Sequence, residues 1–298
     1  MTHRHSQGFT LIELIVVIVL LGLMAAGAGY LIATPIEAYS DQLRRQQLVD
    51  SAEMALHRVE TDIRRALPNS LRIVDNGPTG WALEMVNTVD GARYRDEAGG
   101  GFSAASEILS FTTAGGDQQF NLLGVFSTLP VSGLPLSYGD YHAVIYGTNP
   151  AQIYADAADG NNPGIISPAG ITLNIDATGS EHNLTLASNF QFKFRSPGQR
   201  VFLVDGAVSY LCDSASGTLT RYSQYGFVKN QADVDSAAEL LALGAQTARV
   251  ATQLASCNID YQAGSPWRSG LITLDLVLTD ASNESVRLLH QLHVNNVP

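Results

Sequence analysis

The feature that most constrains this chain is an apolar run close to its N-terminus. From Leu14 to Ala33, 20 consecutive residues carry no charge and no side-chain amide. A helix of that length spans about 30 Å, which matches the hydrocarbon core of a bilayer. One carboxylate, Glu13, lies at the edge of the run, where an ionised side chain costs about 3 kcal/mol or more unless it has a partner. The sequence therefore predicts a membrane-spanning helix that begins beside an acidic residue.

The residues ahead of the run form a short polar leader, Met1 to Gly8, followed by Phe9-Thr10-Leu11-Ile12-Glu13. This arrangement resembles the type IV prepilin signal, in which a leader ending in glycine precedes Phe-Thr-Leu-Ile-Glu. The resemblance implies that a membrane aspartyl peptidase, the prepilin peptidase, cuts between Gly8 and Phe9 and methylates the new amino group of Phe9. It also implies that Glu13 pairs with the terminal amine of a neighbouring subunit.

Two other interpretations of this segment compete with a prepilin signal. An ordinary secretory signal would be cleaved after the apolar part, and residues 25–29 offer small side chains for such a site. A simple membrane anchor explains the apolar run but leaves the Gly8-Phe9 junction and Glu13 unexplained. The prepilin interpretation accounts for all three features.

Charge and cysteine content fit an exported domain. The chain has 17 Lys+Arg against 28 Asp+Glu, a net charge of −11 that disfavours a phosphate backbone as partner, so we expect no nucleic acid. Arg4 on the short side of the apolar run favours a cytoplasmic N-terminus and a periplasmic remainder. Two cysteines, Cys212 and Cys257, suggest one disulfide in an oxidising compartment, with two buried thiols as the alternative. No His cluster accompanies them, which disfavours zinc.

A second helical pattern follows Pro35. Apolar residues recur at spacings of three and four, and Glu60 and Arg64 form a favourable i,i+4 pair on another face. Pro68 ends the pattern. We therefore divide the chain into the leader (1–8), a membrane or filament-core helix (9–34), an amphipathic half of the same helix (35–67) and a head domain (68–298). The predicted packing face comprises Leu48, Ala52, Leu56, Val59, Ile63 and Leu67.

The junction of the two helix halves is rich in glycine and contains Pro35. In the family that this signal resembles, a comparable stretch melts when a subunit enters the filament, which makes residues 25–35 the candidate here. Close helix packing through small residues is the alternative explanation.

The head reads mostly as antiparallel strands, so we predict an α+β, pilin-like fold: a long helix packed on a large β-sheet domain. In the segment 270–279, Ile272, Leu274, Leu276 and Leu278 alternate with polar positions and are predicted to face the core. We expect a long loop at 147–170 and a short helix at 237–243. The predicted strands are 81–88, 107–113, 141–146, 171–175, 190–194, 200–204, 270–279 and 285–294.

The search for catalytic chemistry finds no phosphate-binding loop, nucleophile elbow or zinc-protease motif, so we expect no enzyme, no cofactor and no metal. His290 and His293 fall on opposite faces of a strand. Residues 156–162 hold two Asp and two Asn but lack the spacing of an EF-hand, and a solvated turn is the better interpretation. A sugar site is the alternative to ordinary sheet packing for the tyrosines Tyr138, Tyr141, Tyr146 and Tyr154.

Segments beyond the signal, including 35–39, 49–53, 62–70 and 290–298, resemble minor pilins of the mannose-sensitive haemagglutinin pilus system. This resemblance implies a structural subunit of a pilus assembly-priming or tip complex. Its partners would be the prepilin peptidase and other minor and major pilins, first in the inner membrane and then in the pilus at the cell surface. Two alternatives stay open: a minor pseudopilin of type II secretion of the large J type, and a tip adhesin that binds a glycan.

Overall fold

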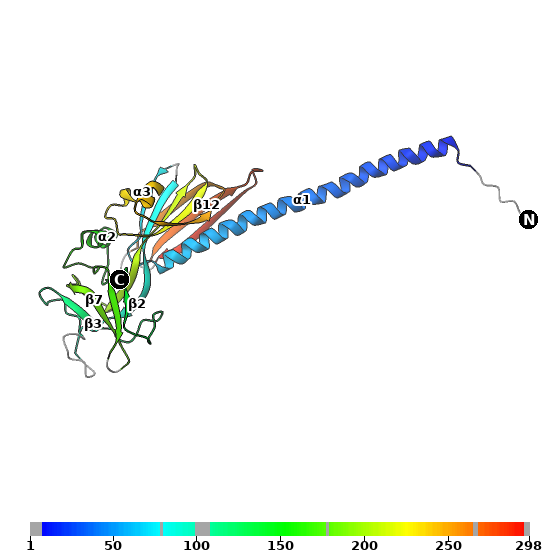
Figure 1. Cartoon of the computed structure of the whole chain (residues 1–298). Helices are drawn as coiled ribbons and strands as arrows, with labels where there is room; N and C mark the ends of the chain where they lie inside the picture. Colours follow the sequence, from blue (N-terminus) through cyan, green and yellow to red (C-terminus); the bar gives the residue numbers. More distant parts are fainter. Residues whose placement is uncertain (1–7, 78–79, 99–107, 177–178, 265–267, 295–298) are drawn as a thin grey trace, which may run out of the picture.

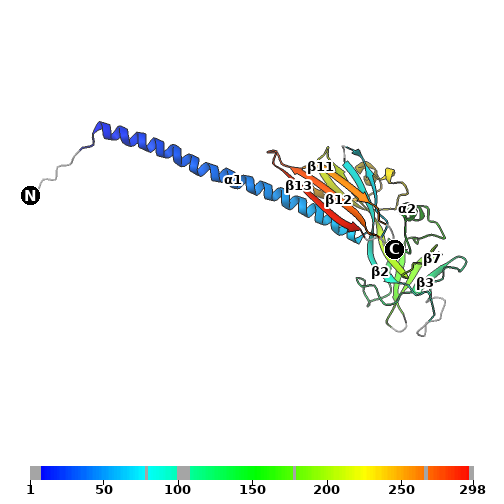
Figure 2. The same cartoon turned by 180° about the vertical axis from the view of Figure 1, so that it is seen from behind.

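The computed structural model describes residues 8–77, 80–98, 108–176, 179–264 and 268–294, and for 29–34 only the backbone. Its longest element is α1 (Leu11–Arg65), a helix of 55 residues, or roughly 80 Å at about 1.5 Å per residue. The N-terminal part of α1 projects away from the head as a rod, while its C-terminal part lies against the sheets (Figures 1 and 2). The helix continues through Pro35 and ends at Arg65, two residues before the predicted boundary.

The described part of the head contains three antiparallel sheets. The largest has the order β1-β2-β8-β9-β10, with β5 also paired to β8; the others have the orders β11-β12-β13 and β3-β7-β6-β4. The strands are β1 (Arg72–Asp75), β2 (Gly80–Arg93), β3 (Asp117–Asn121), β4 (Leu136–Tyr138), β5 (His142–Val144), β6 (Ile171–Ile175), β7 (His182–Phe190), β8 (Arg200–Asp213), β9 (Thr218–Tyr225), β10 (Gln246–Ala251), β11 (Leu254–Gln262), β12 (Gly270–Thr279) and β13 (Ser285–Val294).

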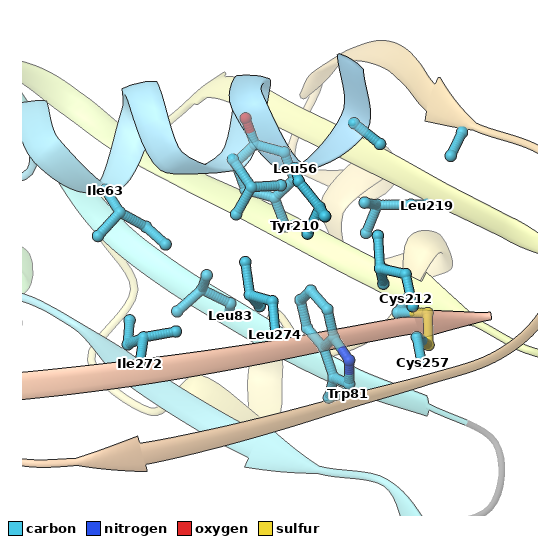
Figure 3. Packing of buried hydrophobic residues seen from close by; sticks show 14 of the residues in the cluster. Leu56, Ile63, Trp81, Leu83, Tyr210, Cys212, Leu219, Cys257, Ile272 and Leu274 are labelled. Atoms are coloured by element: carbon cyan, nitrogen blue, oxygen red, sulfur yellow. A yellow bond between two sulfur atoms is a disulfide. The ribbon is translucent and has the colours of Figure 1, made fainter. Parts of the chain in front are cut away.

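The six-stranded sheet separates two hydrophobic cores. Along β2, Trp81 and Leu83 point into the first core, which α1 and the sheet β11-β12-β13 close from the other side (Figure 3). Ala82 and Val86 point into the second core, beneath α2 (Pro150–Asp159) and α3 (Ala237–Ala242). Alternate side chains of a strand lie on opposite faces, so β2 serves both cores.

A third core fills a distal lobe built on the sheet β3-β7-β6-β4, the part of the head farthest from the start of α1 (Figure 1). It is dominated by aromatic side chains such as Phe120, Phe190 and Phe192. The long strands β2 and β8 run from the first two cores into this lobe. Residues 91–93 of β2 pair with residues 200–202 of β8, and Val201 and Leu203 of β8 belong to the third core. The two strands therefore connect the distal lobe to the rest of the head.

The α+β architecture predicted from the sequence is confirmed. β6, β12 and β13 have the predicted bounds, and the four apolar residues of β12 are buried as expected. The predicted helix at 237–243 is α3, capped by the side chain of Ser236.

The long loop predicted at 147–170 was wrong, because it contains α2. Asn149 caps this helix by accepting a hydrogen bond from the backbone N–H of Ala151, Pro150 occupies its first turn, and Gly160 ends it with φ 64°. These are standard helix start and stop signals, which the density of Pro, Gly and Asn in the segment obscured.

The predicted strand 141–146 is reduced to β5, and 81–88 and 200–204 are parts of the longer strands β2 and β8. Two other predicted strands do not form. Within 107–113, residue 107 lies outside the described residues and 108–113 form bends and irregular chain. The side chain of Asp117, the first residue of β3, accepts a hydrogen bond from the backbone N–H of Ser110. Within 190–194, only Phe190 belongs to a strand. Phe190 and Phe192 pack edge to face at 5.0 Å, so their apolar alternation reflects core packing rather than a sheet ladder.

Candidate functional site: the N-terminal helix and its attachment to the head

Gly8 and Phe9 lie just ahead of α1. A Cβ added to Gly8 would meet no atom within 4 Å, and the backbone there is not in the left-handed region. Phe9 is 82% exposed. The fold therefore does not require glycine at position 8. A requirement for glycine there would come from the enzyme that recognises the Gly8-Phe9 junction.

Glu13 takes part in a capping box with Thr10 at the start of α1. The Thr10 hydroxyl oxygen accepts a hydrogen bond from the backbone N–H of Glu13 at 3.3 Å, and the Glu13 carboxylate accepts from the backbone N–H of Thr10 at 3.5 Å. This arrangement satisfies two backbone N–H groups at the helix start and places a negative charge at the positive end of the helix dipole. Glu13 thus has a local role within the isolated subunit.

The segment Leu11–Ala28 is long and apolar enough to cross a membrane, with a mean hydropathy of 2.7 and none of it buried in the head. Its large side chains, such as Leu14, Ile18 and Leu23, are half exposed or more. A bare apolar rod of this length is stable in lipid or against other apolar helices, and unfavourable in water.

The C-terminal half of α1 is part of the head. All six residues of the predicted packing face are buried, with relative exposures of 5% or less. Five of them lie on α1 and in the first core, whereas Leu67 follows the end of the helix and lies in the second core. Figure 3 shows Leu56 and Ile63 projecting from the helix toward Leu83 and Ile272 of the two sheets. The helix therefore completes the first core.

Asp62 is a buried carboxylate on this half of α1 that sequence reasoning missed. It accepts hydrogen bonds from the Tyr210 hydroxyl of β8 at 2.7 Å and from Nε of Arg221 of β9 at 2.6 Å. Tyr210 directs its hydroxyl at the helix (Figure 3). Its position in the helix could have indicated this burial, because Asp62 lies three residues after Val59 and directly before Ile63, on the apolar face.

Two arginines extend the attachment beyond the apolar face. Nε of Arg44 lies 3.7 Å from Asp280, and the Arg45 guanidinium lies 3.0 Å from Glu284. Both carboxylates belong to the turn between β12 and β13. Both arginines are exposed, and each pair contributes at most about 1 kcal/mol. The contact between α1 and the head therefore begins at residue 44, four positions before Leu48.

The carboxylate of Glu60 on α1 interacts with two basic side chains, Arg64 on the same helix and His290 on β13. The carboxylate accepts from Nε of Arg64 at 2.8 Å, as predicted for the i,i+4 pair, and lies 3.1 Å from Nε2 of His290 on β13. The hydrogen bond from Arg64 lowers the pKa of Glu60, and His290 lowers it further.

We expect Glu60→Gln to lower the free energy of unfolding by at most about 1 kcal/mol at neutral pH. Because the folded-state pKa of Glu60 is below its unfolded value of about 4.3, this contribution is full at neutral pH and is lost as the pH falls through the folded value. Urea titrations of the detergent-solubilised chain at pH 7 and at about pH 3 measure the difference. Glu53→Gln, an exposed change on the same helix, is the control, and a Glu60 effect that persists at the lower pH would contradict the argument.

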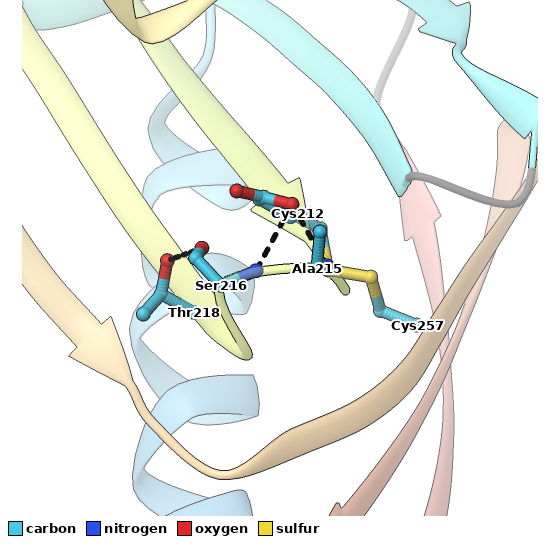
Figure 4. The surroundings of a disulfide bond; sticks show 6 residues. Cys212, Ala215, Ser216, Thr218 and Cys257 are labelled. Carbon is cyan, nitrogen blue, oxygen red and sulfur yellow. Dashed lines mark hydrogen bonds between the residues drawn. A yellow bond between two sulfur atoms is a disulfide. The ribbon is translucent and has the colours of Figure 1, made fainter.

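Cys212 of β8 and Cys257 of β11 are joined in a disulfide, with their Cα atoms 6.6 Å apart. Figure 4 shows the bond beside the turn after β8, where Asp213 accepts hydrogen bonds from the backbone N–H groups of Ala215 and Ser216. The bond connects the six-stranded sheet to the sheet β11-β12-β13, with Trp81 packed beside it (Figure 3). It therefore closes the first core at the edge where α1 enters.

Replacing both cysteines by serine is expected to lower the free energy of unfolding by about 2–4 kcal/mol, because the loop of 45 residues between them regains its freedom in the unfolded chain. Denaturant titration measures this loss. Non-reducing peptide mapping of the exported protein should find the two cysteines in one linked peptide, and a map with both thiols free would contradict the pairing.

The other sequence candidates do not converge on a site. Asp156 is buried and accepts hydrogen bonds from the Asn161 amide and the backbone N–H of Ile165, so the solvated turn was wrong for it. His290 faces α1 and His293 faces solvent on the opposite side of β13, as predicted. Within the described residues, no three His, Cys, Asp or Glu side chains are grouped to hold a metal.

The four tyrosines considered for a sugar site are also divided by the fold. Tyr154 is buried in the second core, whereas Tyr138, Tyr141 and Tyr146 pack against the third. They do not line one common surface.

Comparison with known proteins gives one finding. The family model described as the prokaryotic N-terminal methylation motif matches residues 3–29. No curated protein and no solved structure matches the chain. The motif supports a type IV prepilin-like precursor, of the pilin or pseudopilin type, and proteins that carry it are structural subunits rather than enzymes. Together with the apolar helix, it indicates a membrane-anchored protein that is processed by the prepilin peptidase.

Proposed function

We propose that this chain is a minor pilin, a structural subunit of a pilus assembly-priming or tip complex, of the MshO type in the mannose-sensitive haemagglutinin system. The proposal rests on two features of α1. Its N-terminus carries the methylation motif followed by an exposed apolar segment, Leu11–Ala28, and its C-terminal part contacts the folded head from residue 44 onward. The bare part can exchange membrane lipid for the helices of other subunits while the head stays folded.

In this proposal the prepilin peptidase removes residues 1–8 and methylates Phe9. The subunit waits in the inner membrane with its N-terminus in the cytoplasm and its head in the periplasm, and then joins other pilins through α1. A head of some 230 residues with a distal lobe is bulky for a repeating shaft subunit, which supports a low-copy position.

Quantitative mass spectrometry of purified pili tests the minor role. We expect this chain to be present at no more than about one hundredth of the major subunit, since a tip or priming complex holds few copies for a long shaft. Abundance equal to that of the major subunit would overturn the proposal. Deleting the gene distinguishes a pilin from a pseudopilin. Loss of pili with normal export of secreted proteins supports the pilin. Normal pili with lost export supports a J-type pseudopilin of type II secretion.

The proposed pairing of Glu13 with the terminal amine of a neighbour gives a further expected result. Glu13→Gln keeps the acceptor needed for the capping box but removes the charge. It should therefore weaken capture of the neighbouring subunit several-fold, because an amine left unpaired among apolar helices is costly. Co-purification from detergent extracts measures capture, and intact mass measures cleavage, which should stay normal. Capture that is unchanged in Glu13→Gln would remove the charge-pairing argument.

A further inference from the structure

Two strands share one edge of β8 and leave a gap between them. β9 pairs with residues 207–213 of β8, and β5 pairs with residues 202–204. Asp205 and Gly206 lie between the two paired stretches. A cavity of about 570 Å³ opens at this junction. Its lining includes Asp140, Tyr141, His142, Asp205, Gln224 and Phe227.

The backbone around the cavity is irregular. The register of β8 shifts against both neighbours here, beside Asn87 of β2 and beside Ala207 opposite β9. Gln224 adopts φ 58°, a left-handed conformation that is strained for a residue with a side chain. Bulges of this kind re-aim side chains and are frequent next to binding sites.

The cavity carries negative charge without a positive partner. Asp140 and Asp205 are both exposed, and Asp205 accepts a hydrogen bond from the Asn87 amide at 2.7 Å. No Lys or Arg is among the described residues that line the cavity, and neither aspartate belongs to an ion pair in the described part of the chain. Burial raises the pKa of Tyr141, and the carboxylate of Asp205 raises it further, which is consistent with that charge lying close to the ring.

Aromatic rings form the walls. The lining residue Tyr141 is stacked on Tyr138, which lies behind it and does not line the cavity, with the ring centroids 4.6 Å apart. The ring of His142 meets that of Phe227 edge-on, with the centroids 5.2 Å apart. Nδ1 of His142 donates to the backbone carbonyl of Ser167 at 2.7 Å, and burial lowers the pKa of this imidazole. The lowered pKa favours the uncharged form of His142, which does not offset the two aspartates.

We propose that this cavity binds a basic side chain, an arginine guanidinium or a lysine ammonium, presented by a partner protein. Carboxylates and aromatic faces together favour an organic cation, through charge and cation–π attraction. A metal ion fits less well, because the described residues offer no group of three ligating side chains. An anionic ligand would be repelled. The site goes beyond the proposed function, since neither cleavage nor membrane anchoring depends on it.

The test uses the full-length chain in detergent micelles and two blocked tripeptides, acetyl-Gly-Arg-Gly-amide and its citrulline counterpart, which has nearly the same shape without the charge. Isothermal titration should show the arginine peptide binding about tenfold more tightly than the citrulline peptide, as expected for one cation–π contact and one charge pair. Binding should weaken as the salt concentration rises.

Variants locate the binding in the cavity. Asp140→Asn and Asp205→Asn should each weaken the arginine peptide about fivefold, whereas Asp260→Asn, a matched change on the exposed side of β11, should not. Tyr141→Phe keeps the ring and should keep binding, while Tyr141→Leu should weaken it.

Three results would overturn the proposal. One is equal binding of the arginine and citrulline peptides, and another is no binding of either peptide at millimolar concentration. The third is tighter binding of putrescine than of the arginine peptide, which would identify a free diamine as the ligand instead of a side chain on a partner.

Discussion

Replacing Gly8 by leucine is expected to leave the uncleaved precursor in the inner membrane. A Cβ at position 8 meets no atom of the folded chain, so the substitution should leave the head intact and act only on recognition by the peptidase. An extended glycine lacks the side chain that a narrow peptidase site would exclude. Immunoblotting of membranes and intact-mass analysis measure the ratio of precursor to mature chain.

The matched control is Gly22→Leu, because a Cβ at position 22 also meets no atom and the helix tolerates leucine well. This variant should be cleaved normally and begin with N-methylated Phe9. A mature chain that begins after Ala26 or Ala28 would contradict the prepilin cleavage and favour a secretory signal. Normal cleavage of Gly8→Leu would contradict the role given to Gly8.

Replacing Asp62 by alanine is expected to lower the free energy of unfolding by about 3–5 kcal/mol. The substitution leaves the Arg221 guanidinium and the Tyr210 hydroxyl, both largely enclosed between α1 and the six-stranded sheet, without their acceptor. Denaturant titration of the detergent-solubilised chain, followed by circular dichroism, measures the loss.

Two variants serve as references for that result. Asp50→Ala changes an exposed carboxylate on the same helix and should alter stability by less than about 0.5 kcal/mol. Asp62→Asn keeps an acceptor without the charge and should lie between the two. A loss below about 1 kcal/mol for Asp62→Ala would show that the carboxylate does not anchor the helix.

The parts of the fold that sequence predicts best are those where periodicity reports burial directly. The buried face of α1 from Leu48 to Ile63 and the inward side of β12 follow the rules for a helix and a strand that are half buried. The apolar helix and its motif were likewise readable, because bilayer thickness fixes the length of the run. Both patterns depend on local spacing alone.

The rest depended on contacts between residues far apart in the chain. Asp62 meets Arg221 across 159 positions, and Glu60 meets His290 across 230. No local pattern marks such partners. The helix α2 was missed for a different reason, since its capping residues Asn149 and Gly160 also suit loops. The cavity beside β8 exists only because β5 and β9 share one strand edge, which sequence does not specify.

The way α1 lies in the head determines how the subunit would carry mechanical load. The attached half of the helix runs alongside the sheets, fixed by the Asp62 anchor and by the salt bridges of Arg44 and Arg45 to one turn. A pull along the helix axis would therefore shear all of these contacts at once instead of peeling them apart one by one. The disulfide at the edge of the same core resists separation of the two sheets during such a pull. The head and the attached half of α1 would thus move under tension as a single rigid piece, and any yielding would fall on the part of α1 ahead of residue 44, whose described side chains are exposed.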